Sequence, residues 1–276
     1  MPVNTKTVCN EVCLLAREVG SFLADERKKL SGNVSSESKG IHDYVTRFDK
    51  ESERRIVQRL KQLLPDSDFI AEEGTATRTG KEPFTWIIDP LDGTTNFIHG
   101  MAPTCVSIGL QDNAKSLSLN RPVMALGVVY EIWADECFST CDAEDGALLN
   151  GNAISVSQSP SLNDSLIATG FPYTDFSRID AYMDLLEWTM KGTHGVRRLG
   201  SAAADLIYVA CGRCDGFYEY GLKPYDVAAG AFIVQKAGGV VADFKGGSNW
   251  LHGAEMVAAN NLIFDELISA IKHFKL

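Results

Sequence analysis

Residues 86–97 of this 276-residue chain place two acids around a proline in a spacing that could do chemistry. The apolar run 84–88 is typical of a buried strand. We expect that strand to end at Asp89, because Pro90 cannot donate to a strand ladder and biases the residue before it away from helix. Asp89 and Asp92 then lie three residues apart in a turn, where their carboxylates can converge. Oxygen ligands at that spacing suit a hard cation such as Mg²⁺.

The residues around these two acids complete a predicted metal and phosphate site. The Leu91 carbonyl would be a further oxygen ligand between the two acids. Gly93 lets the backbone approach a ligand closely, and residues 94–96 would open a helix whose unpaired N–H groups bind phosphate. The alternative interpretation is an Asp-Pro turn followed by a helix cap, which any strand-to-helix junction could use.

Acids elsewhere in the chain strengthen the metal interpretation. Glu72 and Glu73 follow a short predicted strand at 69–71, and Asp226 stands in the first turn of a predicted helix. Each also has an ordinary interpretation, as a solvated carboxylate or as a complement to the helix dipole. Four carboxylates about 4 Å apart would repel by roughly 24 kcal/mol in total, more than a typical domain stability of about 5–15 kcal/mol. Divalent cations would relieve that repulsion.

At these positions the chain resembles the inositol monophosphatase family of metal-dependent phosphatases. The resemblance extends from about Lys39 to Asn260, and the ordered set of motifs is highly specific. The matching segments are residues 71–74, 86–100, 150–151, 200–203, 224–230 and 237–239. The resemblance implies an α/β (α+β) fold, a layered αβαβα sandwich of alternating helical and sheet layers.

The resemblance also implies a mechanism, the Mg²⁺-dependent hydrolysis of a phosphate monoester by a metal-activated water, without a covalent intermediate. Two or three Mg²⁺ ions would be held by Glu72, Asp89, the Leu91 carbonyl, Asp92 and Asp226. Thr94, paired with Asp49, would orient the water and accept its proton, with Glu72 as the third catalytic residue. Substrate would be bound by Asp92, Gly93, Thr94, Ala202, Glu219 and Asp226. Lithium should inhibit by replacing a magnesium.

The sequence around Asp49 and Lys39 allows other interpretations of these residues. Asp49 is most simply the N-cap of a helix that carries Ile56 and Leu60, although a cap residue can also serve the site. Lys39 and Asp43 stand where the family has polar residues bordering the active site. Residues 40–42 between them depart from the family pattern, which leaves the role of Lys39 open.

Composition bounds the class of protein. With 45% hydrophobic residues and a mean hydropathy of −0.06, the chain can bury a sizeable core, and no apolar run approaches a membrane span. We expect one domain over residues 1–276. The net charge of −10, without clustered Lys and Arg, disfavours an obligatory nucleic-acid partner. The seven scattered cysteines and the absence of an apolar segment of signal-peptide type in residues 1–6 favour reduced thiols and a cytoplasmic location.

Periodicity and turn residues predict the secondary structure. Helices are expected at 7–30, from Asp49 to Pro65, at 178–190 and from Tyr225, with small residues at a helix start near 200–204. Strands are expected at 69–71, 84–88, 104–110, 123–130, 132–140, 166–169 and 215–218. The connections would be a loop at 31–39, a flap at 74–83, a turn at 111–121 and a tight hairpin at 146–151.

Other reaction classes lack their motifs. No cysteine has an arginine six positions on, as a cysteine phosphatase requires, and neither a phospho-aspartate motif nor His-Glu-x-x-His occurs. The favoured substrate, a small-molecule phosphate ester, is inositol 1-phosphate, because residues 95–100 resemble inositol phosphatases. A 3′(2′),5′-bisphosphate nucleotidase, a fructose 1,6-bisphosphatase or a histidinol phosphatase is the alternative within the superfamily, and a catalytically silent binding protein is the alternative outside it. The resemblance further implies a homodimer.

Overall fold

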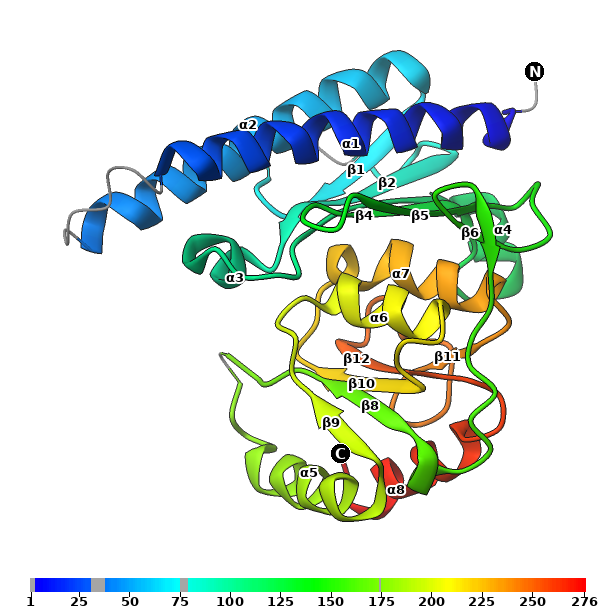
Figure 1. Ribbon diagram of the computed structural model, residues 1–276. Helices are drawn as coiled ribbons and strands as arrows, with labels where there is room; N and C mark the ends of the chain where they lie inside the picture. Colours follow the sequence, from blue (N-terminus) through cyan, green and yellow to red (C-terminus); the bar gives the residue numbers. More distant parts are fainter. Residues whose placement is uncertain (1–2, 31–37, 75–78, 174) are drawn as a thin grey trace.

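The computed structural model describes residues 3–30, 38–74, 79–173 and 175–276, and its elements stack in five layers (Figure 1). A pair of helices covers one face of a seven-stranded sheet. A second pair lies between that sheet and a five-stranded sheet, and a third pair covers the outer face of the smaller sheet. The predicted αβαβα sandwich is therefore confirmed.

The first layer consists of α1 (Thr5–Leu30) and α2 (Ser38–Leu63). In α1 the buried Val12, Val19 and Leu23 recur at intervals of seven and four, so one stripe of the helix faces the sheet. The helix ends with three basic residues that complement the negative C-terminal dipole. In α2, Ile56 and Leu60 form the matching buried stripe, and the helix ends two residues before Pro65.

The large sheet has the order β1-β2-β3-β4-β5-β6-β7. β1 is parallel to β2, and every other neighbouring pair is antiparallel. Its strands are β1 (Ser67–Ala71), β2 (Phe84–Asp92), β3 (Cys105–Asp112), β4 (Met124–Glu131), β5 (Glu136–Cys141), β6 (Ala147–Leu149) and β7 (Asn152–Ile154). Asn150 and Gly151 connect the last two strands, both with positive φ, as the predicted hairpin requires.

The middle layer consists of α6 (Ala202–Ala210) and α7 (Pro224–Lys236), which are buried between the two sheets. α7 lies very close to the large sheet. A Cβ added at Gly127 of β4 would stand 2.8 Å from the Ala229 carbonyl oxygen, and one at Gly109 of β3 would stand 3.2 Å from the Ala228 Cβ. Glycine in the strands and alanine in the helix therefore allow this contact.

The small sheet has the order β11-β12-β10-β8-β9, with β10 parallel to β8 and antiparallel to β12. Its outer face is covered by α5 (Ile179–Gly192) and α8 (Phe264–His273). Its strands are β8 (Leu166–Thr169), β9 (Gly195–Arg197), β10 (Gly216–Tyr220), β11 (Val240–Ala242) and β12 (Glu255–Ala259). The described residues also form three short helices, α3 (Thr94–His99), α4 (Asn113–Leu119) and the 3₁₀ helix η1 (Leu162–Asp164).

The structure corrects three local predictions. β2 does not end at Asp89 but continues to Asp92, because an irregularity in its register with β3 places Pro90 where no ladder hydrogen bond is needed. Asp49 does not cap a helix, since α2 begins eleven positions earlier. Residues 111–121 are not a simple turn but contain α4, capped by the Asp112 side chain, which accepts from the Lys115 N–H at 2.9 Å.

Some predicted features lie partly outside the described residues. Residues 31–37 of the expected loop are not described, whereas its last two positions belong to α2. Residues 75–78 of the expected flap are likewise outside, and so are the side chains of Lys39 and Asp43.

Candidate active site

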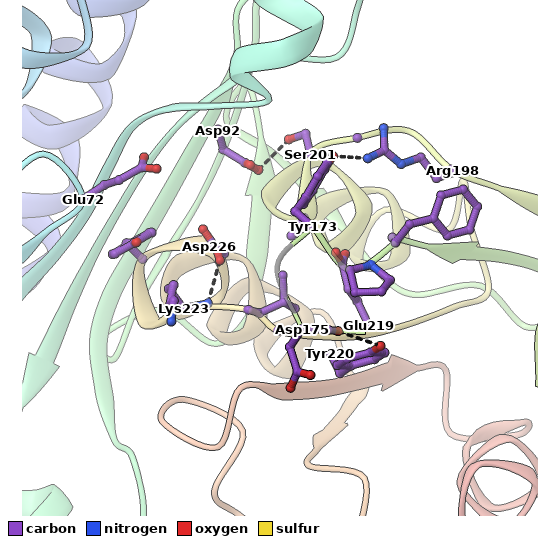
Figure 2. Close-up of a pocket in the computed structure, with 18 residues that line it drawn as sticks. Glu72, Asp92, Tyr173, Asp175, Arg198, Ser201, Glu219, Tyr220, Lys223 and Asp226 are labelled. Carbon is purple, nitrogen blue, oxygen red and sulfur yellow. Dashed lines mark hydrogen bonds between the residues drawn. The ribbon is translucent and has the colours of Figure 1, made fainter. Parts of the chain in front are cut away.

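A cavity of about 390 Å³ opens between the two sheets, beside the starts of α6 and α7. Its wall is built from segments far apart in the sequence (Figure 2). Among the lining residues are five of the predicted site residues, Glu72, Asp92, Ala202, Glu219 and Asp226. The fold therefore brings acids from both sheets and from the middle helix layer to one space.

The turn between β2 and α3 is held by two hydrogen bonds between its own side chains and its main chain. The Asp89 Oδ1 accepts from the Leu91 N–H at 2.9 Å, and Thr94 Oγ1 donates to the Leu91 carbonyl at 3.1 Å. Gly93 has φ +90°, in the left-handed region, and an added Cβ would stand 3.0 Å from the Pro103 carbonyl oxygen. Glycine is therefore required both for the turn and for the close approach of its neighbours.

Asp92 connects this turn to the start of α6. Its Oδ2 accepts from Ser201 Oγ at 2.6 Å and from the Ala203 N–H at 2.7 Å. The Ser201 hydroxyl in turn caps α6 by accepting from the Ala204 N–H at 3.2 Å. Burial raises the pKa of Asp92 to about 6, although these donors act in the opposite direction. The side chain is thus fixed in position at the mouth of the site.

Asp226 and Glu219 face Asp92 from the other side of the cavity (Figure 2). Asp226 lies in the first turn of α7, where its Oδ2 accepts from the Lys223 N–H at 2.6 Å. Burial, and then the charge of Asp92, raise the pKa of Asp226 to about 8. Glu219 on β10 packs against Gly170, where an added Cβ would stand 1.9 Å from the glutamate Cδ. Burial, and then Asp226, raise the pKa of Glu219 to about 8.

Glu72, directly after the end of β1, lies beside Asp89 within the parallel strand β2. β1 delivers Glu72, whose N–H donates to the Ile88 carbonyl of β2 at 3.3 Å. Asp89 is only 2% exposed. Burial, followed by the Glu72 charge, raises the pKa of Asp89. A shared proton is one way to hold two such acids together, and a cation is another.

Asp49 reaches the site from the middle of α2. Its side chain is 6% exposed, and its Oδ1 is buried without a hydrogen-bond partner. Burial, then Glu73 and Glu72, raise its pKa to about 8. Because the Thr94 hydroxyl donates to Leu91, the pairing of Asp49 with Thr94 stays a prediction.

Several lining residues were not among the predicted site residues. Ser201 fixes Asp92, Lys223 donates to Asp226, and Arg198 lies on the opposite wall. The Arg198 guanidinium stands 5.5 Å from the Tyr173 ring centroid and donates to its hydroxyl. Ser201 precedes alanines in the segment that the sequence singled out, so its capping role could have been inferred. No spacing rule connects Arg198 to Tyr173.

The donors in this site are those of a hard cation. Carboxylate oxygens dominate, and the Leu91 carbonyl lies between two of the acids in sequence, which suits Mg²⁺ and not softer metals. Burial is the main cause that raises the pKa values of Asp92 and Asp226, and a bound cation would favour the ionised form of both side chains. In the described part of the chain, no group of three or more His, Cys, Asp or Glu side chains is arranged, as the side chains stand, so that it could hold a metal ion. Asp92 and Asp226 each have one oxygen engaged by protein donors.

Comparisons with known proteins agree with this geometry. The model of the Inositol monophosphatase family matches residues 4–275. A putative Nus factor SuhB from Neisseria meningitidis serogroup B is 39% identical, covering 93% of this chain and 94% of its own length. The Nus factor SuhB of Escherichia coli K12 is 36% identical, covering 93% and 96%. The solved inositol monophosphatase of Anabaena (Nostoc) superposes with a TM-score of 0.81 at 33% identity, over 98% of this chain and 97% of its own.

Proposed function

The chain belongs to the inositol monophosphatase family, and from that premise we propose that it hydrolyses a phosphate monoester, with inositol 1-phosphate as the favoured substrate. The observation that carries this proposal is the convergence of Glu72, Asp92 and Asp226 on one cavity that Glu219 also lines. Glu72 follows the end of β1, Asp92 ends β2, and Asp226 lies in α7, so their meeting is a property of the fold and not of one local motif.

The proposed cofactor is two or three Mg²⁺ ions, held by Glu72, Asp89, the Leu91 carbonyl, Asp92 and Asp226. When bound, such ions lower the pKa of water and stabilise negative charge on phosphate oxygens. The acids that hold them carry raised pKa values in the metal-free chain, which supports a cation as their missing partner.

The remaining residues bind and orient the reactants. The main-chain N–H groups of Gly93 and Thr94, at the start of α3, would hold phosphate oxygens. Asp49 and Thr94 would orient the attacking water and take its proton, a role for which the unpartnered Oδ1 of Asp49 is suited. Glu219 and the Ala202 main chain, on the far wall, would bind hydroxyls of the alcohol.

Phosphate release tests the proposal directly. Phosphate release is measured from three substrates, inositol 1-phosphate, adenosine 3′,5′-bisphosphate and fructose 1,6-bisphosphate. Each is assayed in the presence of Mg²⁺, in the presence of EDTA, and in the presence of Mg²⁺ plus lithium. We expect Mg²⁺-dependent, lithium-sensitive release, mainly from inositol 1-phosphate. Preference for another ester would retain the mechanism and change the substrate, whereas no release from folded protein would refute the proposal.

The variant Asp92→Asn provides the structural control for that assay. It keeps the side-chain size but removes the charge, and turnover should fall by roughly 10³-fold or more. Asp145→Asn changes an exposed acid away from the cavity and should retain full activity. Equal rates in Asp92→Asn and the parent protein would contradict the metal assignment.

The relatives named Nus factor SuhB bring a second candidate function, that of a Nus factor, independent of catalysis. Their identity of 36–39% over 93% of this chain favours it. The two functions separate in the Asp92→Asn variant, tested in cells that lack the wild-type protein. Rescue of a transcription defect by the inactive variant would support the second function, and failure to rescue would leave the phosphatase as the sole proposal.

We also propose a single domain, a cytoplasmic location and a homodimer, the last from the family resemblance. No helix of the described residues is long and apolar enough to cross a membrane. Light scattering coupled to gel filtration measures the oligomeric state, and a monomer at assay concentration would remove the dimer from the proposal.

A further inference from the structure

Four of the seven cysteines gather on the face of the large sheet that α1 covers, remote in sequence from every proposed site residue. Cys9 and Cys13 stand one turn apart on α1. Cys137 and Cys141 lie on β5, and the first of them is paired with Tyr130 of β4. All seven thiols are free.

Contacts of α1 determine how its two cysteines lie over β5. The Cys9 thiol donates to the Thr140 carbonyl at 3.5 Å. Two turns further on, the Arg17 guanidinium stands 5.3 Å from the Tyr130 ring centroid and also bonds Asp135 at the start of β5. Cys13 is midway between these anchors, so it lies over the middle of the strand. There Cys137 projects to the α1 face, and Cys13 packs against the buried cluster that contains both Cys137 and Cys9.

We propose that Cys13 and Cys137 form a redox-modification site, which closes to a disulfide when the protein meets a hydroperoxide. Cys13 is the thiol to attack first, because it is partly exposed, whereas Cys9, Cys137 and Cys141 are buried. Hydrogen bonds from Cys137 and Cys9, with the nearby Arg17, lower the pKa of Cys13 and favour the nucleophilic thiolate.

The reaction balances with hydrogen peroxide as the oxidant. The Cys13 thiolate attacks one peroxide oxygen, the O–O bond breaks, and the departing hydroxide takes a proton to become water. The Cys137 sulfur then attacks the sulfenic sulfur of Cys13, forming the S–S bond and releasing a second water. Two thiols lose two electrons in total, and the peroxide gains them.

Cys137, and not Cys9, is assigned as the second thiol on geometric grounds. Residues four apart on a helix have Cβ atoms about 5–6 Å apart, whereas a disulfide needs about 3.5–4.5 Å. A bond between Cys9 and Cys13 would therefore distort α1. A bond between Cys13 and Cys137 would join α1 and β5, two facing elements that already contact each other.

Thiol counting after peroxide treatment tests the proposal. The folded protein is treated with hydrogen peroxide and unfolded, its free thiols are alkylated and counted, and the disulfide-linked peptides are identified by mass spectrometry. About two of the seven thiols should be lost, with recovery in dithiothreitol. Both the loss and the linked peptide should disappear in Cys13→Ser and in Cys137→Ala, and both should persist in Cys9→Ser, Cys141→Ser and the matched control Cys211→Ser.

A second readout keeps the test valid if a variant folds poorly. Because the cross-link closes a long loop between α1 and β5, oxidation should raise the melting temperature of the parent protein by about 5 °C or more, reversibly. A Cys9–Cys13 linkage, a cross-link only between molecules, or a Cys13 sulfinic acid without any disulfide would each overturn the assignment.

Discussion

The acids of the cavity make the stability of the metal-free protein depend on pH in an unusual direction. Burial raises the pKa values of Asp49, Glu219 and Asp226 to about 8 each. Such a group has a pKa near 4 when the chain is unfolded. The stabilisation that each such group gives to the folded state is therefore fully present below about pH 4 and is lost as the pH rises through about 8. We predict that the metal-free protein becomes less stable between pH 6 and pH 8.

The size of the effect follows from proton linkage. At about pH 6 the folded state holds nearly one more proton per group than the unfolded state, and at about pH 8 it holds about half of one. Integration gives a loss of about 2 kcal/mol per group, or about 4–8 °C in melting temperature. The three groups repel one another, so their losses will not simply add. We expect the melting temperature of the metal-free protein to fall by at least about 4 °C between pH 6 and pH 8.

Thermal unfolding at about pH 6 and pH 8, once with EDTA and once with saturating Mg²⁺, measures this change of melting temperature with pH. Bound Mg²⁺ should abolish the fall, because the cation stabilises the ionised carboxylates in the folded state. Asp226→Asn should reduce the fall in EDTA, since one titrating group is removed, whereas the exposed-site control Asp145→Asn should not. A metal-free melting temperature that rises with pH, or a pH dependence identical with and without Mg²⁺, would refute the reasoning.

Three further predictions concern single residues. Glu219→Ala should raise the KM for inositol 1-phosphate more than that for a simple aryl phosphate, and equal changes would count against a role in binding the alcohol. Ser201→Ala removes the 2.6 Å hydrogen bond to Asp92 and should weaken Mg²⁺ binding roughly 10-fold in calorimetric titration, so an unchanged affinity would show that this support is dispensable. Gly127→Ala should lower the free energy of unfolding by about 1–3 kcal/mol in urea, because the added Cβ would meet the Ala229 main chain. In the control Gly192→Ala the added Cβ meets nothing within 4 Å, so its stability should be unchanged. Similar stabilities for the two variants would contradict the packing argument.

Local chemistry in the sequence predicted the central turn well. Gly93 and the polar residues after it were expected to open a helix, and they do so with a left-handed glycine. The hairpin at Asn150-Gly151 and the start of α7 are likewise where turn and cap residues placed them. These features depend on neighbours in the chain, which is why short-range rules sufficed.

The failures arose where tertiary packing overrides local preference. Asp49 was expected to cap the helix that carries Ile56 and Leu60, yet α2 already begins at Ser38 and continues through Asp49. β2 was expected to end at Asp89, but a register irregularity accommodates Pro90. The Arg198–Tyr173 contact joins segments that only the folded chain brings together. No single-sequence rule connects such residues.

The central position of α7 has a consequence for local motions. Val227, Ala231 and Val234 along this helix are almost completely buried between the two sheets, and its first turn carries Asp226, which lines the cavity. Its amide hydrogens can reach solvent only if one sheet separates from the other, so they should exchange only through nearly global unfolding. The cavity therefore borders the slowest-opening part of the molecule, and an acid of the proposed metal site stands on the element with the least freedom to move.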